Sequence, residues 1–184
     1  TADDLFFKRY GLSGPSVLNI SREISIELNR MKNHADCKIS INFFPGQNKK
    51  QALEFLQSRW NLKPEQSIRN SLVPIFGVKF PDAILEIVNI SEEIPVSNLT
   101  NKQKSKLLSY LTNYTVKISK TRGWNEAEFT AGGVATNEVK PATLESKKSS
   151  NLYLAGEILN VDGDVGGFNL SWAWSSGWIA GKLK

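Results

Sequence analysis

A change of hydrophobic period constrains the fold of this chain more than any other feature of its sequence. Throughout residues 48–113 apolar residues recur at helical spacing, and the patterns indicate about four helices. The segment "KISINFF" alternates apolar and polar residues before this block, and "TVKISKT" does so after it. Because alternation is typical of half-buried strands, we predict a helical block inserted into an α/β domain.

Local signals predict where several of these elements begin and end. Ser13 is expected to cap a helix over residues 16–30, since its hydroxyl can accept bonds from first-turn amides and Pro15 suits the first turn. Pro64 is expected to start a helix within the block, and Pro74 and Gly77 are expected to punctuate the middle of the block. These positions divide the chain into short elements.

Two segments after the helical block are predicted to be strands. "EAEFTAGGVA" is expected to end as a strand at Thr130, Gly132 and Gly133, or to form a tight turn there. "NLYLAGEIL" is a short apolar run, which is typical of a strand buried on both faces. Glu157 would then lie at the carboxyl end of that strand, where open α/β sheets bind ligands and a carboxylate can accept bonds from sugar-like hydroxyls.

The segment "DGDVGGFNLSWAWSSGWIAG" predicts a glycine turn that opens into a helix. Gly166 and Gly167 allow a ligand to approach the backbone closely, and the next two amides, of Phe168 and Asn169, belong to a first helical turn. Those amides lack intrahelical acceptors and lie at the positive end of the helix dipole, so an anion or a polar ring edge fits there. The small residues of this helix fit a buried core helix equally well, and both interpretations stay open.

Composition and charge exclude several classes of function. The net charge of +5 comes from Lys and Arg residues that are scattered along the chain, so nucleic acid is an unlikely main partner. The single Cys37 leaves no internal disulfide and no cysteine-cluster metal site, and His34 is expected on a surface loop. We expect no metal. No apolar run approaches a membrane span and no signal peptide opens the chain, which predicts a cytoplasmic protein without a membrane partner.

Three segments together resemble one protein family. "GLSGPSVLNIS", "TRGWNEAEFTAGGVATNEVKPATLESK" and "NLYLAGEILNVDGDVGGFNLSWAWSSGWIAG" are similar to the BaiN-like, YhiN-type flavoproteins, which are NAD(P)/FAD-dependent oxidoreductases of the aminoacetone-oxidase type. Their occurrence in this order is more specific than any single glycine pair. The resemblance implies an α/β (α+β) fold, the C-terminal part of a glutathione-reductase-like FAD domain with an inserted helical domain.

The resemblance also implies a division into domains. Residues 1–47 would end the β/α region of the insert, residues 48–113 would form its helical subdomain, and residues 114–184 would form the C-terminal part of the FAD-binding domain. The family's first strand, its G-x-G-x-x-G turn and its ribose-binding acid have no counterpart here. We therefore expect the chain to be a C-terminal fragment whose partner is the missing N-terminal half of the same protein.

Within that family pattern the cofactor-binding residues fall into three groups. Gly156 and Glu157 are expected near the ribityl chain or the pyrophosphate of FAD, with Asp162 in the loop that follows. The turn of Gly166, Gly167, Phe168 and Asn169 is expected at the pyrimidine end of the isoalloxazine. Thr130, Gly132 and Gly133 are expected beside the flavin on its catalytic face. No residue stands out as a catalytic acid or base.

The resulting hypothesis is an FAD-dependent oxidoreductase. Its flavin would transfer hydride to or from an unknown small-molecule substrate, with NAD(P)H as the candidate co-substrate. The chain by itself is expected to bind FAD weakly and to be inactive, because half of the contacts would be absent. The alternative is a non-catalytic fragment or an interaction module that binds protein or RNA through the helical insert, whose exposed face carries lysines.

Overall fold

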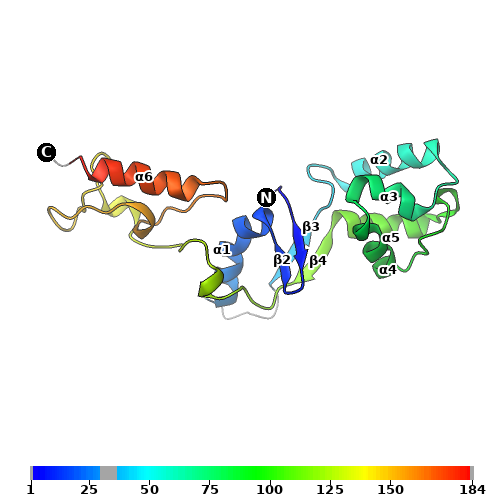
Figure 1. The fold of residues 1–184 in the computed structure, drawn as a ribbon, viewed down its shortest axis with the longest axis horizontal. Helices are drawn as coiled ribbons and strands as arrows, with labels where there is room; N and C mark the ends of the chain where they lie inside the picture. The colour runs from blue at the N-terminus through cyan, green and yellow to red at the C-terminus, as the bar shows by residue number, and fades with distance from the viewer. Residues whose placement is uncertain (1, 30–36, 183–184) are drawn as a thin grey trace. The chain divides into compact units, whose positions relative to one another are not determined.

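The computed structural model describes residues 2–29 and 37–182 of the 184-residue chain (Figure 1). They divide into two compact units. Lys38–Ile118 form one, called here the central unit, and Thr1–Cys37 with Ser119–Lys184 form the other, called the terminal unit. The division at residues 47 and 113 that the family resemblance implies stays a prediction.

The first and last segments of the central unit pair with each other as a two-stranded antiparallel ribbon. Strand β3 covers Lys38–Ile41 and strand β4 covers Tyr114–Lys117, with Ile39 opposite Val116 (Figure 1). Exposed and partly buried side chains alternate along both strands, as the sequence pattern predicts for a ribbon with one covered face. These two predicted strands are confirmed, and they bring the ends of the central unit together.

Four α-helices follow β3, as the helical periodicity predicts. They are α2 (Lys49–Leu62), α3 (Ile68–Phe76), α4 (Lys79–Val88) and α5 (Asn101–Thr112), with a short 3-10 helix, η2 (Val96–Asn98), before α5. Capping boxes begin α2 and α5. The side chains of Asn48 and Thr100 each accept a hydrogen bond from the amide of the third helical residue, and the Gln side chain of that residue accepts one from the backbone amide of the capping residue.

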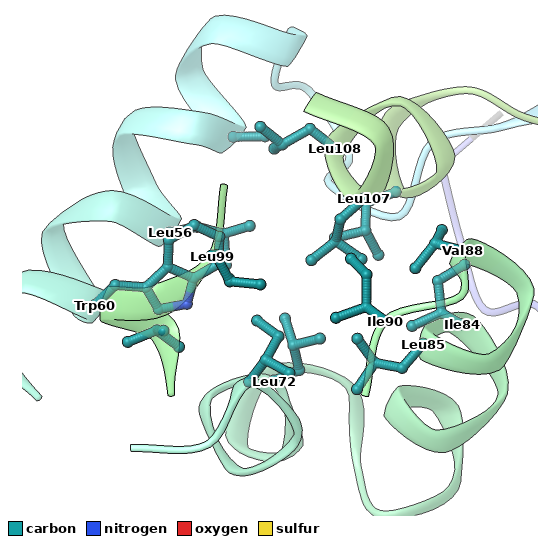
Figure 2. Close-up of a cluster of buried hydrophobic side chains, with 14 of the residues drawn as sticks. Leu56, Trp60, Leu72, Ile84, Leu85, Val88, Ile90, Leu99, Leu107 and Leu108 are labelled. Carbon is teal, nitrogen blue, oxygen red and sulfur yellow. The ribbon is translucent and has the colours of Figure 1, made fainter. Parts of the chain in front are cut away.

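The core of the central unit is built from apolar side chains of all four helices (Figure 2). Within this core the Trp60 indole donates a 3.1 Å hydrogen bond to the buried Ser71 hydroxyl. Each fully buried aliphatic side chain contributes about 1.5 to 3 kcal/mol through the hydrophobic effect. The helical side chains labelled in Figure 2 are Leu56, Trp60, Leu72, Ile84, Leu85, Val88, Leu107 and Leu108.

One proline of the central unit differs from the prediction, and a second lies inside a helix that ends at Gly77 as the sequence indicates. Pro64 does not start a helix, since α3 begins at Ile68 and the Ser67 hydroxyl accepts a 3.3 Å bond from the Asn70 amide. Pro74 lies inside α3 and does not interrupt it. Proline removes the bond that its amide would give to the Asn70 carbonyl, but the burial of Ile68 and its neighbours in the core outweighs that loss.

The terminal unit begins with a hairpin and a helix. Strand β1 covers Phe6–Lys8 and pairs in antiparallel fashion with β2, which covers Gly11–Ser13. Helix α1 covers Pro15–Asn29. The predicted helix is therefore confirmed over its described length, while its last predicted residue, Arg30, lies outside the described residues, as does His34. Cys37 is buried as a free thiol.

The predicted cap of α1 is wrong. Ser13 belongs to β2, and Gly14 occupies the position before the helix. Gly14 has a φ of +101°, and a Cβ on it would lie 2.6 Å from the Asp4 carbonyl oxygen. A capping serine has no room where the chain turns this tightly, so glycine makes the turn and serine ends the strand.

The rest of the terminal unit is largely irregular until its last helix. The predicted C-terminal helix is confirmed as α6. None of the helices within residues 2–29 and 37–182 combines the length and the apolar character that a membrane span requires. The elements after β4 are the 3-10 helices η3 (Trp124–Glu126), η4 (Thr136–Glu138) and η5 (Gly156–Ile158), and then α6 (Phe168–Ala180).

The two strands predicted in this region are absent from the described residues. Their segments make isolated bridges instead, parallel between Val134 and Leu159 and antiparallel between Glu145 and Tyr153. Ile158 is 54% exposed, so the second segment is not buried on both faces. An apolar run forms a central strand only between two neighbouring strands, and the described residues supply none on either side.

Candidate functional site

The strongest feature of the terminal unit is the open N-terminus of α6. Gly166 and Gly167 both have positive φ, +134° and +88°, and the helix begins directly after them. The first amide with a helical acceptor is that of Ser171, which bonds the Gly167 carbonyl at 2.9 Å. In the described part of the chain, no side chain caps this end and the amides of residues 168–170 have no acceptor. Three donors at the positive end of a helix are thus available to an electron-rich group.

The loop before α6 is held by the protein itself. The Asn169 carboxamide oxygen accepts a 2.8 Å bond from the Gly163 amide, and its nitrogen donates a 3.0 Å bond to the Gly163 carbonyl. A Cβ on Gly163 would lie 2.9 Å from the Phe168 Cβ, so glycine is required for this contact. Sequence reasoning missed this pairing. The side chain of Asn169 fixes the loop, while its backbone amide stays open.

Helix α1 supports the same loop from a distant part of the sequence. The Asp162 carboxylate forms a 3.4 Å ion pair with Arg22, and it is only 15% exposed. The Val165 amide donates a 2.7 Å bond to the Asn19 side chain. Asp162 is therefore already paired within the chain, and its first role is to position the glycine turn. Nothing in the sequence pattern around Asn19 or Arg22 indicated this support.

Glu157 and Thr130 meet in space although they are far apart in sequence. The Glu157 carboxylate accepts a short hydrogen bond from the Thr130 amide. Glu157 itself lies in η5 rather than at the end of a strand, and it is exposed. One carboxylate oxygen is thereby engaged, and the contact joins two of the three predicted groups of cofactor-binding residues.

Gly156 anchors η5 to α6. Its amide donates a 2.8 Å bond to the Ser176 hydroxyl, and its carbonyl accepts a 3.1 Å bond from the Trp172 indole. Ser176 is fully buried, and Gly156 has a φ of +71°. Gly156 therefore has a structural role that depends on α6, and this contact also explains the buried serine at position 176.

The glycine pair at Gly132 and Gly133 lies against η5. The Val134 amide donates to the Ile158 carbonyl at 2.8 Å. A Cβ on Gly133 would lie 2.4 Å from that same carbonyl oxygen, and Gly133 has a φ of +134°. Gly132 also has positive φ, +98°. The backbones approach so closely that the second glycine is required, and the segment from Thr130 packs on the segment that carries Glu157.

One face of α6 is exposed and strongly apolar. Trp174 is 80% exposed and Trp178 is 65% exposed, and with Ala173 and Gly177 they line an open groove. The opposite side of the helix, including Trp172, packs on the small core of Val139, Leu144 and Leu159. The helix is thus apolar on both sides, a pattern that is typical of helices buried in larger proteins.

A second polar cluster joins the β1–β2 turn to the segment before η3. The Arg122 guanidinium lies 4.2 Å from the centre of the Tyr10 ring and forms a 2.7 Å ion pair with Glu126. A side-chain hydrogen bond with Ser13 lowers the pKa of the Tyr10 phenol, and Arg122 acts in the same direction. Sequence reasoning missed Tyr10, because its contact with Arg122 depends on the fold.

The sequence model of one protein family, described as the HI0933-like protein Rossmann domain, matches residues 13–183 of this chain. The chain belongs to this family. The resemblance inferred from the three sequence segments is thereby confirmed, together with a Rossmann-type α/β class. The finer description, an inserted helical domain in a glutathione-reductase-like fold, stays a prediction.

Curated relatives of this HI0933-like chain are longer proteins. The chain is 36% identical over 173 residues to a 3-dehydro-bile acid delta(4,6)-reductase of Clostridium scindens, covering 94% of this chain and 42% of the relative. It is 35% identical over 184 residues to a ribosomal RNA dihydrouridine synthase of Escherichia coli, covering 98% and 42%. A protein of the same name from Haemophilus influenzae is 31% identical over 178 residues, covering 95% and 40%. The chain thus spans about two fifths of the length of these relatives.

Proposed function

We propose that this chain supplies the ribityl and isoalloxazine side of an FAD site in an oxidoreductase. The observation that carries the proposal is the uncapped N-terminus of α6, where the amides of residues 168–170 have no acceptor among the described residues. The flavin, when bound, supplies hydride transfer, and the protein supplies position and electrostatics. Membership of the HI0933-like family supports the choice of cofactor.

The residues present fit such a group. Gly166 and Gly167 carry no side chain that would block a ring from the helix end, and both are exposed. The amides of Phe168 and Asn169 would stabilise negative charge on the electron-rich edge of the ring. Glu157, with one oxygen engaged by Thr130, would accept bonds from ribityl hydroxyls through its carboxylate.

The names of the relatives support a reduction as the reaction. One is named as a reductase of a 3-dehydro-bile acid, and two are named for making dihydrouridine in ribosomal RNA. Dihydrouridine is uridine with two added hydrogens, so both names describe hydrogen addition to an unsaturated framework. We propose NAD(P)H as the source of the hydride. The names of the relatives give two candidate substrate classes, a steroid-like molecule and an RNA base.

Cofactor content of the full-length protein tests this proposal. We expect purified full-length protein to show the visible absorbance of a flavin, either as isolated or after FAD is added and excess is removed. The 184-residue chain alone should bind FAD weakly. A full-length protein that stays colourless after incubation with FAD would refute the assignment, and submicromolar binding by the chain alone would refute the division of the site.

A further inference from the structure

Helix α1 contributes two polar side chains to the loop that precedes α6. Asn19 and Arg22 are three positions apart, which places them on the same face of the helix. The Val165 amide donates a 2.7 Å hydrogen bond to the Asn19 side-chain oxygen. The Arg22 guanidinium lies 3.4 Å from the Asp162 carboxylate. One face of α1 therefore holds the loop of residues 162–165 at both of its ends.

The same loop is in direct contact with the first turn of α6. The amide and the carbonyl of Gly163 both bond the Asn169 side chain, at 2.8 and 3.0 Å. A Cβ on Gly163 would lie 2.9 Å from the Phe168 Cβ. Because Gly163 directly follows Asp162, the residue paired with Arg22 adjoins this contact. A change in the position or the charge of the loop is therefore transmitted to the open end of the helix.

Helix α1 is anchored independently of α6. The Ser16 hydroxyl donates a 2.6 Å hydrogen bond to the Asp3 carbonyl. Gly14 approaches the Asp4 carbonyl oxygen so closely that a Cβ would lie 2.6 Å from it. Further along the helix, Ile24 is buried. These contacts fix α1 in the terminal unit, so that the helix can serve as a support for the loop.

The ion pair also determines the charge beside the open amides. A carboxylate is attracted to the positive end of a helix, where it competes with any other electron-rich group. The Asp162 side chain is only 15% exposed, so water screens its charge incompletely, and Arg22 supplies the opposite charge. Asp164 lies in the same loop but is exposed, where water screens it well. Pairing with Arg22 thus leaves the positive end of α6 available to a ligand.

We propose that Asn19 and Arg22 are positioning residues of the flavin site. Asn19 fixes the backbone of the turn before α6. Arg22 neutralises Asp162, so that the open amides can stabilise negative charge on the reduced ring. The inference rests on the function proposed above, and it adds α1 to the site. It also gives Asp162, which the family pattern places at the cofactor, a role that acts through the loop.

A cycle of charge substitutions in the full-length protein tests the role of the ion pair. The variants are Arg22→Gln, Asp162→Asn and the two combined. The control is Asp164→Asn, which removes the same charge from an exposed position in the same loop. For each variant we would measure the affinity of the apo form for FAD and the midpoint potential of the bound flavin. The thermal midpoint of the apo form reports structural damage separately.

We expect Arg22→Gln to weaken the binding of reduced FAD roughly tenfold more than that of oxidised FAD, because the unpaired Asp162 carboxylate repels the added negative charge. This difference lowers the midpoint potential by about 30 mV. Asp162→Asn should raise the potential, the double variant should return close to the wild-type value, and Asp164→Asn should leave it unchanged. A merely structural role would give no such recovery in the double variant, and that result would overturn the inference.

Substitutions of Asn19 test the geometric part of the inference. Asn19→Ala removes the acceptor of the Val165 amide and should weaken the binding of oxidised FAD about 2-fold to 12-fold, the effect of one neutral hydrogen bond. Asn19→Asp keeps an accepting oxygen and should restore that binding. The matched control is Asn29→Ala, which removes an exposed asparagine at the other end of α1 and should bind FAD as the wild type does.

The same measurements separate this inference from the proposed function. If the wild type binds FAD and the variants at Asn19, Arg22 and Asp162 behave like the two controls, the role of α1 is refuted and the flavin function stands. A full-length wild type that stays colourless after incubation with FAD refutes both.

Discussion

Removing one backbone amide from the N-terminus of α6 tests the flavin site most directly. Proline lacks an amide hydrogen, and the first helical position tolerates it because that amide has no helical acceptor. Phe168 occupies this position and its side chain is 62% exposed. The substitution Phe168→Pro therefore deletes one donor, and Phe168→Ala removes the same ring while it keeps the amide.

The expected loss follows from the strength of one hydrogen bond to a charged group. Such a bond contributes about 1.5 to 3 kcal/mol. Since about 1.4 kcal/mol corresponds to a factor of ten, Phe168→Pro should weaken FAD binding about 10-fold to 150-fold relative to Phe168→Ala. If the amide bonds the reduced ring more strongly, the flavin potential of the Pro variant should also fall, by about 30 mV for each 1.4 kcal/mol.

The assay is an FAD titration of the apo form of each full-length variant, followed by absorbance. Far-UV circular dichroism and the thermal midpoint check that α6 still forms in the Pro variant. Equal affinity of the Pro and Ala variants for FAD, with both folded, would show that the Phe168 amide faces no part of the cofactor. The central observation behind the proposed function would then have another explanation.

Two further predictions concern stability. Gly133→Ala should lower the thermal midpoint clearly, because its Cβ would lie 2.4 Å from the Ile158 carbonyl oxygen at a φ of +134°, whereas Gly123→Ala meets nothing and should have little effect. A 2.6 Å hydrogen bond from Lys140 lowers the pKa of Glu145 below its ordinary 4.5, so the pair stabilises the fold above that pH and stops doing so as the pH falls through the lowered pKa. In the Glu145→Gln variant the thermal midpoint should therefore fall less than in the wild type as the pH is lowered from neutral to acidic. If the two midpoints fall equally, the ion pair does not contribute to this pH dependence.

Much of the central unit could be predicted because its signals are local. The period of 3.6 residues and the caps at Asn48 and Thr100 act within one or two turns, so the sequence around each helix contains the information. Pro74 is the exception, because its place inside α3 depends on burial against other helices. The predicted strands at β3 and β4 succeeded for the same reason, since alternation records one covered face.

The candidate site was predictable only where backbone conformation dictated residue type. Gly166 and Gly167 predicted a glycine turn before a helix. In the structure both residues have positive φ and α6 begins directly after them. The contacts that hold this helix start in place could not be predicted from the sequence, because the hydrogen bond between Val165 and Asn19 joins residues 146 positions apart. A hydrogen bond between distant residues leaves no periodic trace in either segment.

The strands that failed to appear and the exposed face of α6 have one physical explanation. An apolar pattern indicates that a segment is buried, but the described residues by themselves do not cover either of these segments. Ile158 and Trp174 are both exposed here although their segments have the composition of buried elements. The relatives are more than twice as long as this chain, so both positions should be tested where any covering segment is present. For that reason the Phe168→Pro comparison belongs in the full-length protein: in the isolated chain, weak FAD binding by every variant would hide the effect of a single amide.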